Sequence, residues 1–243
     1  MQKTDRGLTL FYRDSQKLDK LIYLLTEERG LFIAVAKGAK KGKNRFGGSL
    51  EPLNEIEINL YEKENSEFPI LEKVNLIKNN TPIFDTVDNY NYLMAMIEII
   101  IKLTPQKIKQ DKMLRLLKAL IKTLKENRQE VKKLFNYFLV WFLRIEGYLP
   151  EFNVCYECGK QYENFTKFYL SSDGSKMLCE RCKTKNSIEI PLSLNIFLKV
   201  SKSMSPMNFI SVKFNNEKEI MNFLLKIINI NGETKINSLK QLI

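Results

Sequence analysis

The sequence predicts an α+β protein of several domains, in which a five-stranded β-barrel precedes a set of helices. Three observations predict this class. Hydrophobic residues alternate at a period of two in short runs up to about residue 80, and from Asp85 they recur every three or four residues. Four cysteines form two CxxC pairs in the second part. We expect a barrel domain over 1–80 and a helical domain over 81–243, with a zinc-ribbon-like insertion at about 152–186.

Five runs in the first 80 residues have the pattern of strands. They cover residues 7–12, 21–26, 31–36, 56–60 and 74–76, and polar or glycine-containing turns separate most of them. The fourth run shows the alternation best, because polar residues stand between Ile56, Ile58 and Leu60. Five short strands in so short a segment predict a small closed barrel, and the OB-fold is the five-stranded candidate.

From Asp85 the hydrophobic period is that of amphipathic helices. A helix that ends before Pro105 is predicted by the spacing of Leu93, Met96, Ile97, Ile100 and Ile101. Residues 109–127 and 129–146 predict two more. Beyond the cysteines, residues 191–204 and 217–230 predict two final helices. The second part of the chain is therefore expected to be mainly helical.

The charge balance indicates a polyanionic partner. The chain of 243 residues has a net charge of +11 and a pI of about 9.3. Its positive charge concentrates in residues 1–48 and 102–133, whereas residues 49–101 are acidic. Nucleic acid is the usual partner of such a protein, and an anionic membrane surface is the other.

The absence of histidine excludes several function classes. The chain lacks the histidine that a Ser-His-Asp triad, a Cys-His pair, a histidine general base or a histidine metal ligand requires. Glu62, Glu64 and Glu67 lie close together, but their spacing is not diagnostic of a metal-dependent enzyme. We therefore expect a binding protein and not an enzyme.

The sequence carries no sign of secretion or membrane insertion. The first residues are polar and no apolar segment follows them, so a signal peptide is not expected. The most apolar stretch, residues 93–103, is short and carries Glu98 and Lys102, which disfavours a membrane span. We expect a cytoplasmic protein without a membrane partner.

The cysteines predict a metal site. Cys155 and Cys158 form the first CxxC pair, and Cys179 and Cys182 form the second. Two such knuckles complete a tetrahedron of sulfur ligands around one cation, and residues 168–174 between them resemble a hairpin. Four soft ligands with no open position indicate structural Zn²⁺. An iron–sulfur centre that uses the same ligands is one alternative, and four free cysteines are the other.

A glycine-rich basic loop follows the third predicted strand. Its cations are Lys37, Lys40, Lys41, Lys43 and Arg45, and it contains no acidic residue. Glycines allow the backbone to approach a phosphate, so the loop fits the tracking of a sugar-phosphate strand. A solvated surface loop is the alternative. A P-loop is rejected because Asn44 stands where Ser or Thr must hold Mg²⁺.

The second predicted helix carries a basic face. Its cations are Lys112, Arg115, Lys118, Lys122 and Lys125. This face fits a second phosphate-binding surface, the ordinary solvated side of an amphipathic helix, or a membrane-surface helix. Among the aromatic residues of the barrel, Phe11, Tyr12, Tyr23 and Phe32 are candidates for stacking on bases, although aromatic residues in a barrel more often belong to the core.

Two segments of the first domain resemble a known family. Residues 26–41, with Thr26, Glu27 and Gly30 followed by the Ala36-Lys37-Gly38-Ala39 run, and residues 45–52 are similar to the N-terminal domain of the RecO recombination mediators. The order of parts, with a barrel, helices, two cysteine knuckles and final helices, is similar over the whole chain. After Cys182 the similarity is limited to the order of the helices.

The resemblance implies an OB-fold, a helical domain and an inserted zinc-binding element. It implies binding of single- and double-stranded DNA, annealing of complementary strands, and partnership with RecR and with the C-terminal tail of single-stranded DNA-binding protein. With RecR, such a protein loads RecA in gap repair, so the resemblance also implies association with the bacterial nucleoid. The basic barrel residues of the family correspond to Lys37, Lys40, Lys41, Lys43 and Arg45.

A second interpretation of the same sequence is a zinc-ribbon protein that binds RNA or acts in transcription, with the ribbon itself in contact with nucleic acid. Acidic residues nearly balance the lysines of residues 155–185, and a Zn²⁺ held by four thiolates would add further negative charge. This balance favours DNA binding by the barrel loop and the basic helix.

Overall fold

The computed structural model describes residues 2–15, 18–40, 46–62, 64, 66–150, 154–161, 167–232 and 236–242. Contacts between residues divide the chain into two compact units, 1–128 with 236–243 and 129–235. The first unit therefore holds the predicted barrel and the first two helices of the predicted helical domain. The boundary at residue 80 stays a prediction.

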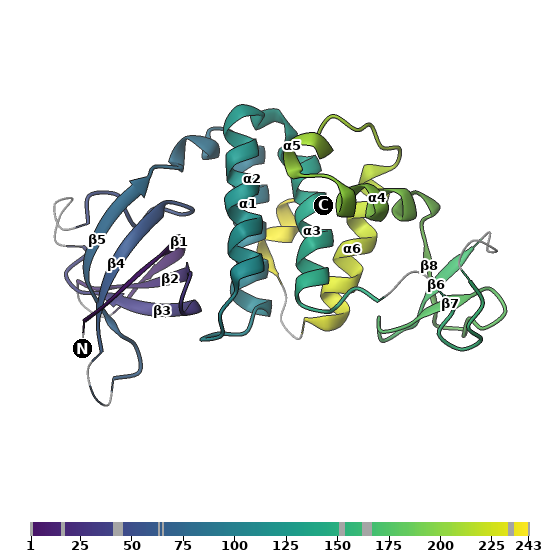
Figure 1. Ribbon diagram of the computed structural model, residues 1–243, viewed down its shortest axis with the longest axis horizontal. Coiled ribbons are helices and arrows are strands. Elements are labelled where there is room, and N and C mark those ends of the chain that lie inside the picture. Colours follow the sequence, from purple (N-terminus) through teal and green to yellow (C-terminus); the bar gives the residue numbers. More distant parts are fainter. Residues whose placement is uncertain are drawn as a thin grey trace. The chain divides into compact units, whose positions relative to one another are not determined.

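The first unit contains the predicted five-stranded closed barrel, with strand order β1-β2-β3-β5-β4 (Figure 1). The strands are β1 (Gln2–Asp14), β2 (Lys20–Thr26), β3 (Gly30–Ala36), β4 (Glu55–Tyr61) and β5 (Ile70–Lys78). β1 is long enough to pair with β4 through its first half and with β2 through its second, with an irregularity between Thr9 and Phe11. A single parallel pair, Val35 with Ile70, joins β3 to β5.

The barrel core follows from the alternation of the strands. Ile56, Ile58 and Leu60 point inward from β4, where they are fully buried with Ile22 and Leu24 of β2. Burying side chains of this size stabilises the fold by about 1.5–3 kcal/mol each. The other face of the same strands is left to polar residues, which makes the barrel a platform for surface charges.

Two helices complete the first unit. The short η1 (Thr81–Phe84) leads into α1 (Val87–Leu103), and α2 (Asp111–Glu126) follows. The Thr86 side chain caps α1 by accepting a hydrogen bond from the backbone N–H of Asn89 at 3.1 Å. The final turn η4 (Asn237–Gln241) returns to α1, where Glu98 accepts hydrogen bonds from the backbone N–H groups of Asn237 and Ser238.

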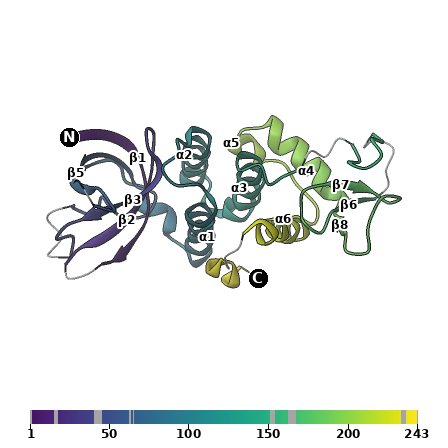
Figure 2. The ribbon, with the colours of Figure 1, turned by 90° about the horizontal axis from the view of Figure 1, so that it is seen from below.

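The second unit combines helices with a small sheet. After η2 (Arg128–Glu130), its helices are α3 (Val131–Ile145), α4 (Leu192–Ser203), α5 (Pro206–Phe209) and α6 (Glu217–Asn231). The sheet has the order β7-β6-β8 and is formed by β6 (Phe168–Leu170), β7 (Met177–Cys179) and β8 (Ile188–Ile190) (Figure 2). Fully buried phenylalanines of α3, among them Phe135, Phe138 and Phe142, provide much of the helical core.

The predicted strands and helices are confirmed, although β1, β5 and α1 all begin earlier than predicted, at Gln2, Ile70 and Val87. The hairpin between the cysteine pairs is confirmed as β6 with β7. β8 and the short α5 are additions. None of the helices in the described part of the chain has both the length and the apolar character that a membrane span needs.

Candidate metal centre and nucleic-acid interface

The four cysteines come together in the second unit. Cys155 and Cys158 form the first knuckle, Cys179 ends β7 and Cys182 lies in the turn that follows. Their Sγ atoms all lie within 4.8 Å of one another, and those of Cys158 and Cys179 are 3.9 Å apart. Tetrahedral Zn–S bonds of about 2.3 Å require sulfur atoms about 3.8 Å apart, so the cluster can hold a metal ion.

The backbone of each knuckle orients its sulfurs. The N–H of Gly159 donates to the carbonyl of Cys155 at 2.9 Å, and Gly159 has a φ of +67°, which glycine adopts without strain. In the second knuckle, the N–H groups of Cys182 and Lys183 both donate to the carbonyl of Cys179 at 3.0 Å. The CxxC spacing thus produces two tight turns that aim four sulfurs at one point.

Hydrogen bonds to sulfur favour a thiolate in this cluster. Burial raises the pKa of the Cys155 thiol, but backbone N–H groups of Cys179, Cys158 and Glu157 outweigh that effect and lower the pKa to about 6. The other sulfurs, Cys179 first among them, favour the protonated Cys182 thiol through hydrogen bonds and charge, and they raise the pKa of Cys182 to about 12. A cation in the middle would remove this mutual repulsion, because metal ions bind thiolates rather than thiols.

The structure describes only part of the basic loop. Lys37 is exposed, whereas Lys40 forms an ion pair with Asp14 at 3.1 Å and donates to the carbonyl of Ser15. The predicted DNA-binding residues Lys41, Lys43 and Arg45 lie outside the described residues. The turn at 37–40 is fixed against residues 18–19 by hydrogen bonds from Lys40 N–H to the Leu18 carbonyl and from Gly38 N–H to Asp19.

The cations on the basic face of α2 lie in two different environments. Lys112, Arg115, Lys122 and Lys125 are exposed. Lys118 instead contacts the barrel, where its ammonium lies 2.9 Å from Glu55 and 3.1 Å from Glu27. Burial lowers the pKa of Lys118, but the two carboxylates outweigh it and raise that pKa overall. Four of the five predicted cations are therefore exposed, and of these Lys125 also donates to the Asn79 carbonyl after β5 at 3.3 Å, while Lys118 joins α2 to the barrel.

The four aromatic candidates differ in how exposed they are. Phe32 is buried in the barrel core, Tyr12 and Tyr23 are half-buried, and Phe11 is 37% exposed. Two cations beside these rings were not among the predicted site residues. The Nζ of Lys20 lies 3.7 Å from the centre of the Tyr12 ring, and the guanidinium carbon of Arg13 lies 5.9 Å from that of Tyr23. The alternation of β1, which places Arg13 two residues after Phe11, is the signal that points to Arg13, whereas Lys20 begins β2 and no local pattern links it to Tyr12.

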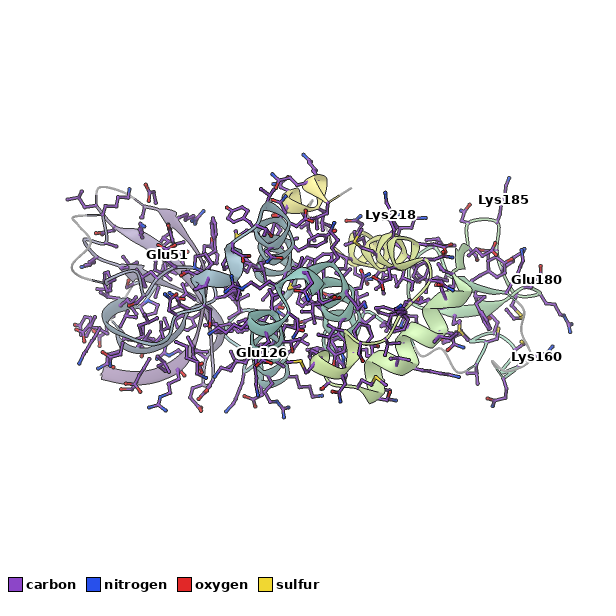
Figure 3. All side chains as sticks on the ribbon, turned by 90° about the horizontal axis from the view of Figure 1, so that it is seen from above. Glu51, Glu126, Lys160, Glu180, Lys185 and Lys218 are labelled. Carbon is purple, nitrogen blue, oxygen red and sulfur yellow. The ribbon has the colours of Figure 1, made fainter. Side chains whose placement is uncertain are left out.

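We use the term ribbon for the described residues 154–161 and 167–190, which hold the cysteine cluster. Several lysines of the ribbon face acids. Lys176 pairs with Glu157 at 3.3 Å and Lys167 pairs with Glu189 at 3.5 Å. Figure 3 shows Lys160, Glu180 and Lys185 projecting from this part of the molecule, so cations and acids are interspersed on it. This mixture is a poor surface for a phosphate backbone.

The acidic residues near position 64 do not form a metal site in the described part of the chain. Glu62 instead forms an ion pair with Arg29 at 2.6 Å. Among the described residues, the cysteine quartet is the one cluster of potential ligands close enough to share a metal ion.

Two family models match the chain. The model described as "Recombination protein O N terminal" matches residues 1–80, and that described as "Recombination protein O C terminal" matches residues 85–240. Together they cover the barrel, the helices and the ribbon.

Curated relatives match over nearly their whole length. The DNA repair protein RecO of Koribacter versatilis is 27% identical over 97% of this chain and 96% of its own. That of Syntrophobacter fumaroxidans is 25% identical over 99% and 97% of the two chains. That of Thermodesulfovibrio yellowstonii is 29% identical over 88% of each.

Proposed function

Because this chain belongs to the RecO family of DNA repair proteins, we propose that it is a DNA-binding recombination mediator. It anneals complementary single strands and, with RecR, helps to load RecA on DNA coated with single-stranded DNA-binding protein. The observation that carries the proposal is the match of both family models to a chain whose barrel and second helix carry exposed cations.

Charge neutralisation supplies the mechanism. Two complementary strands repel each other, and a protein that holds both phosphate backbones lowers this repulsion and raises the local strand concentration. The basic loop, with Lys37, Lys40, Lys41, Lys43 and Arg45, binds one backbone. The second backbone lies along Lys112, Arg115, Lys122 and Lys125 of α2, while Lys118 holds α2 to the barrel. No covalent step is required, so the protein acts without being an enzyme.

The metal has a structural role in this proposal. Cys155, Cys158, Cys179 and Cys182 hold Zn²⁺, and their four sulfurs leave no ligand position for a substrate. The ion ties both knuckles to the short sheet, in a part of the chain whose strands have only three residues each.

The partners proposed are single- and double-stranded DNA, RecR and the C-terminal tail of single-stranded DNA-binding protein. The site of action is the bacterial cytoplasm, at the nucleoid. RNA binding by the ribbon is the weaker alternative, because acids neutralise ribbon lysines such as Lys167 and Lys176. Crosslinking of nucleic acid to the ribbon, with none to the barrel loop, would favour it.

A salt titration of affinity for single-stranded DNA tests the proposal. Log affinity falls linearly with log salt, with a slope of about −0.7 per phosphate neutralised. Substituting Lys37, Lys41 and Lys43 by glutamine should make the slope shallower by up to about 2 units. A control in which the exposed Lys199, Lys202 and Lys226 are changed to glutamine lowers the net charge equally and should keep the slope. Wild-type affinity that does not depend on salt would refute the proposal.

A further inference from the structure

The first unit contains an aromatic cavity beside the barrel. Its volume is about 350 Å³, and its lining includes Phe11 and Tyr12 of β1 and Phe84 and Tyr90 from the segment of η1 and α1. All these residues belong to one compact unit. Small-molecule sites are typically concave, mostly apolar and about 300–1,000 Å³ in volume, so this cavity is near the lower end of that range.

The aromatic rings of the cavity are accessible. Phe11 is 37% exposed and Tyr90 is 52% exposed. The rings of Phe11 and Tyr12 are nearly parallel, with centroids 6.4 Å apart, and that of Tyr90 meets the Phe84 ring edge-on at 6.2 Å. Rings that serve only a core would be covered, as Phe32 is.

The charges around the cavity favour a base inside it and phosphates beside it. Glu51 lines the cavity, and Figure 3 shows it on the barrel. A carboxylate there repels a phosphate, but it accepts a hydrogen bond from the amino group of a base. The cations lie next to the cavity and not in its lining. Lys20 lies over the ring of Tyr12, and Arg13 lies near the ring of Tyr23, whose centroid is 6.2 Å from that of Phe11.

We propose that this cavity binds one unstacked base of a DNA single strand, which packs against Phe11 and Tyr90. Arg13 and Lys20 bind the phosphates on either side of that base. The inference rests on the proposed DNA-binding function and adds a base-binding position to it. It also gives single strands a contact that a duplex lacks, because the bases of a duplex are stacked on each other. An apolar side chain of a partner protein is the rival occupant.

The test compares two probes of equal length, an oligo(dC) and its abasic counterpart. The abasic strand keeps the phosphates and removes the rings, so it separates stacking from charge. The variants Phe11→Ala and Tyr90→Ala should weaken oligo(dC) binding by about fivefold or more. Binding of the abasic strand should change less than about twofold, because the phosphate contacts remain.

Tyr61→Ala is the matched control. Tyr61 is 41% exposed on β4 and does not line the cavity, so its loss should leave both affinities unchanged. Phe11→Trp provides a measurement that does not depend on the alanine variants folding. The wild type has a single tryptophan, Trp141, so the additional fluorescence of this variant comes from position 11. That fluorescence should be quenched by oligo(dC) and not by the abasic strand.

Two results would overturn the inference. Equal losses on both probes, or no loss on either, would mean that no base enters the cavity and would leave it to a protein side chain. Unquenched fluorescence of the Phe11→Trp variant on saturation with oligo(dC) would have the same meaning. If the wild type binds neither probe at low salt, the proposed function itself fails. If it binds both and the variants behave like Tyr61→Ala, only the base-binding cavity is refuted.

Discussion

Gly30 begins β3 with a φ of +64° in a position that leaves no room for a side chain. A Cβ at this residue would lie 1.8 Å from the carbonyl oxygen of Ile108. Next to it, the N–H of Lys107 donates to the carbonyl of Leu31 at 2.8 Å. The turn that carries the Thr-Glu-x-x-Gly resemblance is therefore the place where the barrel docks on the segment between α1 and α2.

Gly30→Ala should destabilise the protein by at least about 2 kcal/mol, because it adds a backbone clash to the cost of the positive φ. Gly47→Ala is the control. Gly47 also has a positive φ, of +50°, but a Cβ there meets nothing within 4 Å. Urea unfolding measures both variants. Equal losses would show that the clash with Ile108 is relieved without cost.

The cysteines make a second prediction at the scale of single residues. The wild type should contain one zinc ion per chain, and Cys182→Ser should lose most of it, because three thiolates bind zinc far less tightly than four. Elemental analysis gives the metal content of both proteins. In Cys182→Ser, hydrogen exchange should show faster opening of β6 and β7 than of the barrel. Iron with visible absorbance in the wild type would contradict a zinc site.

At the scale of elements, α2 is held to the barrel by Lys118, whose ammonium bridges Glu27 and Glu55. The sequence pattern groups Lys118 with the other cations of one helix face, because a local pattern shows only the spacing of residues along the helix. Glu27 is 91 residues away in sequence, so this pairing is invisible until the chain folds.

Lys118→Gln should therefore lower the free energy of unfolding by about 1 kcal/mol, a value limited by the partial exposure of the pair. Lys122→Gln, one helical turn away and exposed, should leave stability unchanged and weaken DNA binding. Thermal unfolding and DNA titration of the two variants, measured side by side, separate these roles. A stability loss for Lys122→Gln as large as that for Lys118→Gln would contradict the division of this face.

The contact between α1 and η4 predicts a pH dependence. Burial raises the pKa of Glu98, but Lys102 and the Ser238 and Asn237 donors outweigh it and lower the pKa from 4.5 to about 2. The charged form is thus favoured in the folded state. Its stabilisation is complete above pH 4.5 and is lost as the pH falls through 4.5 toward 2.

Glu98→Gln should cost about 2 kcal/mol at neutral pH and flatten the loss of stability between pH 4.5 and 2. Glu126→Gln, at an exposed carboxylate of α2, is the control and should keep the wild-type profile. Urea unfolding across this pH range provides the measurement. An unchanged profile for Glu98→Gln would show that its contacts do not stabilise the folded state.

The sequence predicted most elements because their signals are local. The alternation of β4 and the heptad-like spacing of α2 each arise within one element. Residues 2–6 of β1 were missed because they are mostly polar, and their strand conformation depends on pairing with β4. The cysteine cluster could be predicted for the same reason as the helices, since each CxxC knuckle is a short-range motif. The aromatic cavity could not, because β1 and α1 meet only in the folded unit.

The molecule as a whole carries an excess of positive charge. A net charge of +11 attracts any polyanion, and we propose that the cations on α2 and on the barrel loop provide two surfaces for DNA backbones. The ribbon contributes little to this field, since its lysines alternate with acids. In the proposed function, the barrel and α2 of the first unit bind DNA, and the metal of the second unit has a structural role.

Strand annealing tests this claim most directly. Complementary oligonucleotides, bare or coated with single-stranded DNA-binding protein, are mixed with the full chain at increasing salt, and duplex formation is followed by fluorescence transfer. The account predicts faster annealing in both cases at low salt, with the acceleration disappearing as salt screens the phosphate contacts. Annealing at the uncatalysed rate at every salt concentration, in the presence of folded protein, would contradict it.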